Sequence, residues 1–140
     1  MHFDHVGLSV ADLDTQVAWY CEAFGLRETT PFAIPLLSLH GTFVVGVHGL
    51  AIELLERAGS VPGIQAADQA EALLTRGYGH ICIRVDDVDT THARLLGLGA
   101  SERLAPQASP EPGVRMSFVS DPEGNLIELL DRRVPVGART

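Results

Sequence analysis

The chain repeats itself at a fixed distance of 75 residues, and this internal repeat restricts the possible folds more than any other feature of the sequence. The segment that starts at Asp4 aligns with the segment that starts at Gly79, and residues 43–56 align with residues 118–131 at the same offset. One offset that holds across two separated segments is typical of a duplicated module.

The duplication predicts how the chain is organised. We expect a single domain of two repeats, because 140 residues suit one compact domain. The segment between the repeats is rich in Gly, Pro and Ala and is interpreted as a linker that holds a short helix. The predicted parts are module one at 1–57, the linker at 58–75, module two at 76–132 and a tail at 133–140.

Each module is predicted to fold in the order β-α-β-β-β. Valine- and leucine-rich runs indicate strands, Asp12 or Asp14 is expected to N-cap the helical segment of module one, and Gly25 or Gly99 ends the helix. A turn at 121–124, Asp-Pro-Glu-Gly, joins the last two strands. The strands expected in module one are 3–10, 28–33, 36–47 and 50–56; those in module two are 79–85, 102–105, 114–120 and 125–131, with a helix at 88–98.

These elements predict an α+β fold in which two β-α-β-β-β modules in tandem form a curled, mixed-sheet cleft. Such modules leave sheet edges and one apolar strand face uncovered, and a twofold partner can cover them. We therefore expect a homodimer.

Charge and cysteine content exclude several classes of function. The formal net charge is -8 and the chain contains no lysine, so no basic patch for a nucleic-acid backbone is expected. No apolar run reaches the length of a membrane span, and the N-terminus lacks the pattern of a signal peptide. The two cysteines do not form a Cys-x-x-Cys motif. We expect a cytoplasmic protein that acts on a small molecule, without a nucleic-acid or membrane partner.

Four side chains obey the repeat and have metal-binding chemistry. His5 and His80 open the equivalent first strands, and Glu53 and Glu128 lie midway along the equivalent last strands. Pseudo-twofold symmetry places all four around one axis if they point into the concave face. Two imidazoles and two carboxylates suit one divalent ion, namely Zn, Ni, Co, Mn or Fe(II), and leave positions open for substrate.

Structural explanations compete with this interpretation. A lone His near the start of a strand is usually structural or solvated, and Glu53 would simply face water in a half-exposed sheet. However, Leu55 shares the face of Glu53, and Leu130 shares the face of Glu128, so each carboxylate lies among apolar residues and needs a partner. The remaining histidines lack the symmetry and are interpreted as surface or core residues: His2, His40, His48 and His92.

Three further polar residues are candidates for substrate binding. Strand periodicity places Ser9 with His5, and Arg84 with His80, so Arg84 is available to meet a substrate anion; the alternative is a rim position paired with an Asp of 86–89. Arg115 on a later strand is a weaker candidate. Cys82 is interpreted as a small buried filler rather than a nucleophile.

The paired strand sequences His-Val-Gly-Leu-Ser-Val and His-Ile-Cys-Ile-Arg-Val, with Ile-Glu-Leu-Leu twice and Asp-Pro-Glu-Gly-Asn before the second, resemble the vicinal oxygen chelate superfamily. This superfamily includes glyoxalase I, methylmalonyl-CoA epimerase, extradiol dioxygenases, fosfomycin-resistance enzymes and bleomycin-resistance proteins. The resemblance implies the vicinal oxygen chelate fold. The four residues that fall on the ligand positions of glyoxalase I are His5, Glu53, His80 and Glu128.

Similarity to glyoxalase I implies a lyase or isomerase that abstracts a proton α to a carbonyl through a metal-bound enediolate. The resemblance gives the role of base to Glu128 first and to Glu53 second. Ser9 departs from the pattern, because bacterial glyoxalase I typically has arginine there to hold a glutathione carboxylate. An Fe(II) extradiol-type dioxygenase and a drug-binding resistance protein without catalysis remain as alternatives.

Overall fold

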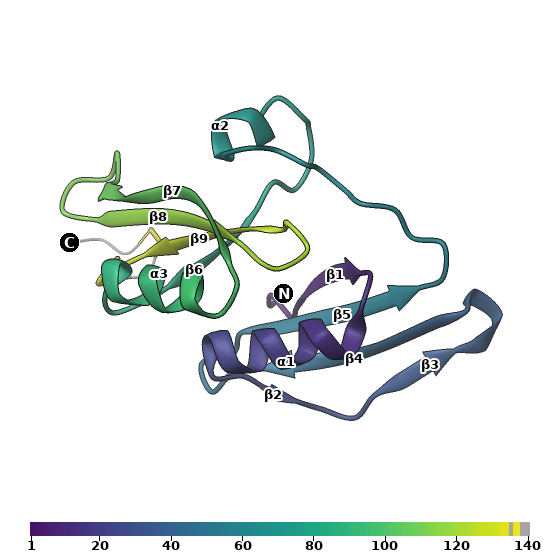
Figure 1. Ribbon diagram of the computed structural model, residues 1–140. Coiled ribbons are helices and arrows are strands. Elements are labelled where there is room, and N and C mark those ends of the chain that lie inside the picture. Colours follow the sequence, from purple (N-terminus) through teal and green to yellow (C-terminus); the bar gives the residue numbers. More distant parts are fainter. Residues whose placement is uncertain (135, 138–140) are drawn as a thin grey trace. The chain divides into compact units, whose positions relative to one another are not determined.

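The protein is described by a computed structural model that covers residues 1–134 and 136–137. The chain divides into two compact units, Met1–Pro62 and Gly63–Thr140. Figure 1 shows that each unit is a sheet with one main helix on one of its faces. This mixed α and β content confirms the predicted fold class. No helix in the part of the chain that the structure describes is long and apolar enough to cross a membrane.

The first unit contains a five-stranded sheet with the order β1-β5-β4-β2, and β3 also pairs with β4. The outer pair β1 and β5 is parallel, and the other pairs are antiparallel. Its elements are β1 (Val6–Val10), α1 (Leu13–Phe24), β2 (Arg27–Glu28), β3 (Phe32–Ile34), the 3-10 helix η1 (Pro35–Leu37), β4 (Leu39–Val45) and β5 (Ala51–Arg57).

The second unit repeats this plan with a four-stranded sheet in the order β6-β9-β8-β7. Here β6 and β9 are parallel, and the other pairs are antiparallel. Its elements are α2 (Gln69–Ala72), β6 (Ile81–Arg84), α3 (Val88–Gly97), β7 (Ser101–Ala108), β8 (Arg115–Ser120) and β9 (Leu126–Leu130).

The two main helices begin at equivalent aspartates. The Asp12 carboxylate accepts a hydrogen bond of 2.9 Å from the backbone N–H of Thr15, and Asp87 accepts one of 2.8 Å from Thr90. Each aspartate satisfies a helix N–H that has no partner within the helix. Gly25 ends α1 in the left-handed conformation, with φ of 64°, where glycine carries no steric cost. The predicted helix boundaries are confirmed within about one residue at these positions.

Each helix covers the face of the sheet that carries the most deeply buried aliphatic residues. In the last strand of each unit, these residues flank the repeated glutamate and are 0% exposed: Ile52, Leu54, Ile127 and Leu129. Since side chains alternate along a strand, Glu53 and Glu128 point to the opposite face of their sheets. The core therefore includes the space between helix and sheet, and the carboxylates lie on the face of each sheet opposite its main helix.

Module one differs from the prediction in its middle strands. The expected strand at 28–33 is two short strands, β2 and β3, which both pair with β4. Pro31 lies between them, and proline has no N–H to donate to the ladder. The next strand begins at Leu39 rather than at residue 36, because Pro35–Leu37 forms the 3-10 helix η1.

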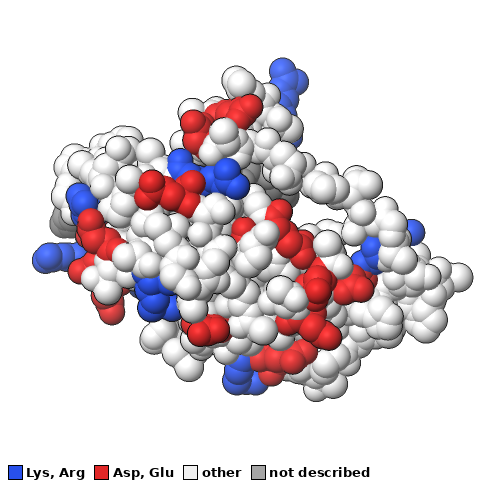
Figure 2. All heavy atoms as spheres, viewed as in Figure 1, with Lys and Arg blue, Asp and Glu red and all other residues white. Residues whose placement is uncertain are grey.

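The surface agrees with the acidic composition. Figure 2 shows acidic side chains over much of the displayed face, with arginines in separate places among them. No continuous basic surface is visible on this face.

Candidate metal centre

The first unit brings His5 and Glu53 together. His5 directly precedes β1, Glu53 lies at the middle of β5, and the distance from His5 Nε2 to Glu53 Oε2 is 3.5 Å. Gly7 is the register partner of Glu53 on β1, and a Cβ at that position would lie 3.5 Å from Glu53 Oε2. A side chain at position 7 would therefore be in ordinary van der Waals contact with the carboxylate.

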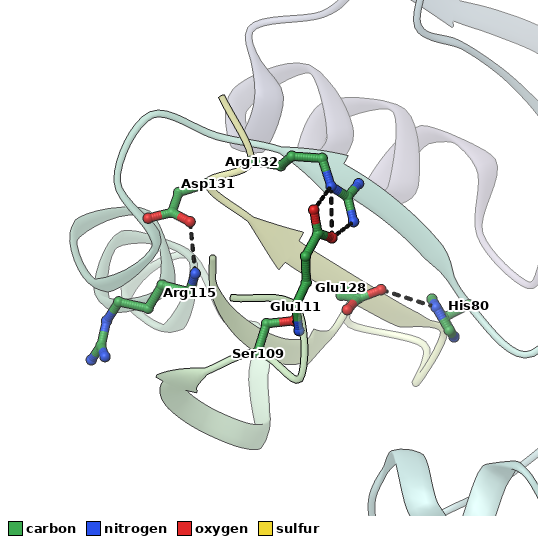
Figure 3. A network of polar contacts seen from close by, with 7 residues as sticks. All are labelled: His80, Ser109, Glu111, Arg115, Glu128, Asp131 and Arg132. Atoms are coloured by element: carbon green, nitrogen blue, oxygen red, sulfur yellow. Dashed lines mark hydrogen bonds and ion pairs between the residues drawn. The ribbon is translucent and has the colours of Figure 1, made fainter. Parts of the chain in front are cut away.

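The second unit contains the same pair at the equivalent positions. His80 directly precedes β6, Glu128 lies at the middle of β9, and His80 Nε2 is 3.1 Å from Glu128 Oε2 (Figure 3). Cys82 is the register partner of Glu128 on β6, where the first unit has glycine. The structure thus brings together each predicted His–Glu pair within its own unit.

A phenylalanine supports each imidazole. Phe43 meets the ring of His5 edge-on with ring centroids 5.1 Å apart, and Phe118 meets His80 in the same way at 5.2 Å. Both phenylalanines are register partners of the glutamates, Phe43 with Glu53 and Phe118 with Glu128. Edge-to-face packing restricts the orientation of each ring, so both pairs are held by the same local packing.

The donors in both pairs suit a divalent cation. The imidazoles are 34% and 28% exposed, and the carboxylates of Glu53 and Glu128 are 22% and 17% exposed, so a ligand can reach all four groups. An imidazole nitrogen beside a carboxylate oxygen is a ligand combination that Zn and other borderline ions accept. Within the described residues, no group of three or more His, Cys, Asp or Glu gathers as a metal cluster, and each unit supplies one pair.

Asp4 gives His5 a second contact that the sequence analysis missed. The Asp4 carboxylate lies 2.7 Å from His5 Nδ1, which leaves Nε2 facing Glu53. This hydrogen bond, together with the nearby Glu53 charge, raises the pKa of His5. A carboxylate on the far nitrogen of a ligating histidine is a common orienting partner. Gly79 occupies the equivalent position in module two, so only the first pair has this support.

The candidates Ser9 and Arg84 lie on the faces that carry the glutamates. Ser9 is two residues beyond Gly7 on β1, and Arg84 is two residues beyond Cys82 on β6. Both residues are exposed. They occupy equivalent positions of the repeat, with a hydroxyl in one unit and a guanidinium in the other.

Arg115 lies on the other face of its sheet. On β8, Phe118 is opposite Glu128, so the side chain of Arg115 alternates onto the helix face. There its Nε and a terminal nitrogen donate to the Asp89 carboxylate of α3 at 2.5 and 2.8 Å. This pair raises the pKa of Arg115 and lowers that of Asp89. The structure therefore does not bring Arg115 to the His80–Glu128 pair.

Cys82 is exposed rather than buried, so its interpretation as a buried filler was wrong. The residue is exposed as a whole, but neighbouring atoms shield the thiol from water. This desolvation raises the pKa of Cys82 to about 12, and the Glu128 carboxylate adds to the shift. The thiol is therefore neutral at neutral pH, which is the weakly nucleophilic form.

Arg132 and Glu111 are polar residues near the second pair that the sequence analysis did not select. Arg132 follows β9 and holds Glu111 of the β7–β8 loop (Figure 3). The loop position of Glu111 depends on how the hairpin between β7 and β8 folds, and the 75-residue repeat gives no signal for it. Arg132 aligns with Arg57 in the repeat, and this repetition is the sequence feature that could have identified Arg132.

The four remaining histidines occupy surface or core positions, as predicted. His2, His40 and His48 are exposed. His92 on α3 is 3% exposed, and its Nε2 lies 2.9 Å from the Glu102 carboxylate.

Comparison with known proteins places this geometry in a family. The family model of the Glyoxalase/Bleomycin resistance protein/Dioxygenase superfamily matches residues 2–129. A probable lactoylglutathione lyase of Vibrio cholerae is 28% identical over 92% of this chain and 89% of its own length. A second from Synechocystis is 25% identical over 90% of this chain and 92% of its own length.

Solved structures show the same fold. The chain matches glyoxalase I from Zea mays with a TM-score of 0.74 and 24% identity, over 92% of this chain and 44% of the maize chain. The trypanothione-dependent glyoxalase I of Leishmania major matches with a TM-score of 0.69 and 26% identity, over 94% of this chain and 86% of that one. The duplicated modules, their repeated His–Glu pairs and the match along most of the sequence agree, and the chain belongs to the Glyoxalase/Bleomycin resistance protein/Dioxygenase superfamily.

Proposed function

We propose that the protein is a metal-dependent lyase or isomerase of the glyoxalase I type, which moves a proton α to a carbonyl of a small-molecule substrate. The observation that carries this proposal is the duplicated pair in which an imidazole Nε2 faces a carboxylate oxygen, at 3.5 Å in one unit and 3.1 Å in the other. The relatives named lactoylglutathione lyase support a lyase.

The proposed metal ligands are His5, Glu53, His80 and Glu128, two from each unit, with one divalent ion per chain. Zn, Ni, Co, Mn and Fe(II) all accept two nitrogen and two oxygen donors. When bound, such an ion supplies a positive charge that polarises a carbonyl and offsets negative charge developing on its oxygen. Asp4 and the two phenylalanines keep the imidazoles oriented toward their carboxylates.

Glu128 is proposed as the base that receives the α-proton, with Glu53 as the second candidate. A general base must stand within hydrogen-bonding reach of the carbon acid and be mobile enough to accept the proton. Each carboxylate is partly exposed and has one oxygen near its histidine. Two carboxylates at one ion titrate as a coupled set, so the assignment requires separate variants.

The proposed substrates are adducts of a thiol with an α-oxoaldehyde, or related compounds that present two neighbouring oxygens. The names of the relatives point to glutathione, whereas the glyoxalase I of Leishmania major depends on trypanothione. Ser9 offers a hydroxyl where glyoxalase I typically has arginine. A thiol other than glutathione, or an acyl thioester, therefore remains within the proposal.

Exchange of solvent deuterium tests the proposed reaction directly. The metal-loaded protein is incubated in D2O with hemithioacetals of several thiols and with 2-methyl-branched acyl thioesters, and incorporation at the α-carbon is followed by NMR. We expect exchange with at least one of these substrates. Absence of exchange with all of them, together with O2-dependent ring cleavage of a catechol, would favour the dioxygenase alternative. Absence of both reactions would favour a binding protein.

We also propose that the protein is a homodimer. Each sheet has edge strands, and the main helix of each unit packs on the face of the sheet opposite the glutamate. A second copy related by a twofold axis is the commonest way to cover such surfaces. Light scattering at micromolar protein concentration is expected to give about twice the chain mass of 15.0 kDa. A metal-loaded monomer under these conditions would disprove the dimer. The cytoplasmic location stays a prediction.

A further inference from the structure

Arg132, four residues beyond Glu128, forms a bidentate pair with the carboxylate of Glu111. Its Nε donates to Glu111 Oε1 and Oε2 at 3.0 and 2.9 Å, and a terminal nitrogen donates to Oε2 as well (Figure 3). Glu111 belongs to the loop between β7 and β8, and its side chain is 44% exposed. The guanidinium therefore already binds a carboxylate in the planar geometry that arginine prefers.

The charge of Arg132 lies close to the second His–Glu pair. The hydrogen bond to Glu111 is the main cause that raises the pKa of Arg132, and the charge of Glu128 adds to it. Arg132 in turn lowers the pKa of the Cys82 thiol. The side chain of Arg132 is 21% exposed. A partly buried guanidinium within electrostatic range of Glu128 is placed to act on whatever binds there.

Arg84 contributes a second guanidinium on the same face. Its register partner on β9 is Leu130, whereas Cys82 is the partner of Glu128, so Arg84 lies about 7 Å along the strands from Glu128. Arg84 is exposed, and within the described residues its guanidinium has neither a hydrogen bond nor an ion pair. The alternative expectation of a pair with an Asp of 86–89 is therefore not met.

The two arginines distinguish the second unit from the first. At the equivalent repeat positions the first unit has Ser9 and Arg57, so one of these two positions holds a cation where the second unit has two. The chain has a net charge of -8, so its overall field repels anions. Binding of a carboxylate near Glu128 therefore requires local positive charge, which these two guanidinium groups provide.

We propose that Arg84 and Arg132 form a carboxylate subsite beside the His80–Glu128 pair, and that Glu111 occupies Arg132 until the substrate carboxylate replaces it. The proposal rests on the proposed function, which places the reacting oxygens at His80 and Glu128. The substrate class is then a metal chelator that carries a carboxylate several bonds from its two chelating oxygens. Both arginines that would bind this carboxylate belong to the second unit.

The test uses two probes that differ only in charge. Glutaric monohydroxamate offers two chelating oxygens and a carboxylate tail, and its primary amide offers the same oxygens with a neutral tail. Calorimetry with the metal-loaded full-length chain is expected to show about tenfold or more tighter binding of the carboxylate probe, the scale of a charge-assisted hydrogen bond. The same preference, at weaker affinity, is expected for the metal-free protein.

Four variants test the residues. Arg84→Ala and Arg132→Ala are each expected to remove most of the preference for the carboxylate probe while leaving the affinity for the amide unchanged. Arg84→Ala removes no side-chain hydrogen bond or ion pair among the described residues, so it keeps the test valid if Arg132→Ala destabilises the loop. Glu111→Gln is expected to tighten carboxylate binding severalfold, because it removes the internal competitor. Arg57→Ala is the matched control at the equivalent position and is expected to retain the preference.

Equal affinity for the two probes, or binding of neither, would overturn the subsite. Equal loss of preference in Arg57→Ala and Arg132→Ala would also overturn it, because net charge would then explain the effect. The outcomes separate the two proposals. A carboxylate preference that depends on Arg84 without any α-proton exchange would disprove the proposed function alone, whereas exchange without a preference would disprove the subsite alone.

Discussion

Replacing His80 with alanine is expected to remove most of the divalent metal from the purified protein. The imidazole supplies one of only two nitrogen donors in the proposed ligand set, and its loss leaves Glu128 without the partner that lies 3.1 Å away. Loss of an orienting neighbour of a ligand typically weakens metal binding by about 10–100-fold, and loss of the ligand itself is expected to exceed this range. His5→Ala is expected to behave in the same way.

Elemental analysis after dialysis measures the effect, and a matched histidine provides the control. His48 is exposed in the turn between β4 and β5 and has no equivalent in the repeat, so His48→Ala is expected to keep a full complement of metal. Circular dichroism confirms that each variant is folded. Full metal content in both His5→Ala and His80→Ala would place the metal elsewhere and remove the basis of the proposed function.

Much of the fold was predictable because the duplication tests each local signal twice. Asp12 and Asp87 precede equivalent helices, and both cap them through the same side-chain hydrogen bond. Pro31 aligns with Pro106 in module two, where β7 remains one strand of eight residues and its register with β8 shifts between Leu104 and Gln107. The same proline position therefore separates two short strands in one module and only shifts the register in the other, a difference that the repeated sequence does not reveal.

The site was predictable where residue parity along one strand determined the face. Counting in twos from His80 placed Arg84 on the glutamate face, which the β6–β9 register agrees with. The face on which Arg115 lies could be assigned only from the register between β8 and β9. The pairing of Phe118 with Glu128 shows that Arg115 faces the helix. Register across strands depends on turn geometry and packing, which a single sequence specifies weakly.

Contacts made by loops were the least predictable part of the site. Glu111 reaches Arg132 because the turn after Ser109 is closed by backbone hydrogen bonds between Ser109 and Val114 and between Val114 and Glu111. Neither the strand period nor the 75-residue repeat contains this information. The ion pair nevertheless changes the chemistry of the second unit, since it keeps a carboxylate within reach of a guanidinium beside Glu128.

Glu128→Gln is expected to lower turnover by about 10²-fold or more per bound metal, which is the usual scale for the loss of a general base. Glutamine is nearly isosteric with glutamate and retains one oxygen for the metal, so the fold and part of the metal binding should survive. Its amide cannot accept the α-proton, and the defect should therefore appear in kcat, with KM for the substrate changed much less. Initial rates of deuterium exchange, divided by metal content, measure this effect.

Glu53→Gln is the matched control, because the repeat gives Glu53 the same strand position, the same type of histidine partner and a similar exposure. If Glu128 is the base, Glu53→Gln loses metal affinity to a similar extent but retains most of its turnover per bound metal. The reverse result would assign the proton transfer to Glu53 of the first unit. Equal losses of turnover in both variants would show that the two carboxylates share the proton-transfer role, as strongly coupled acids at one ion can.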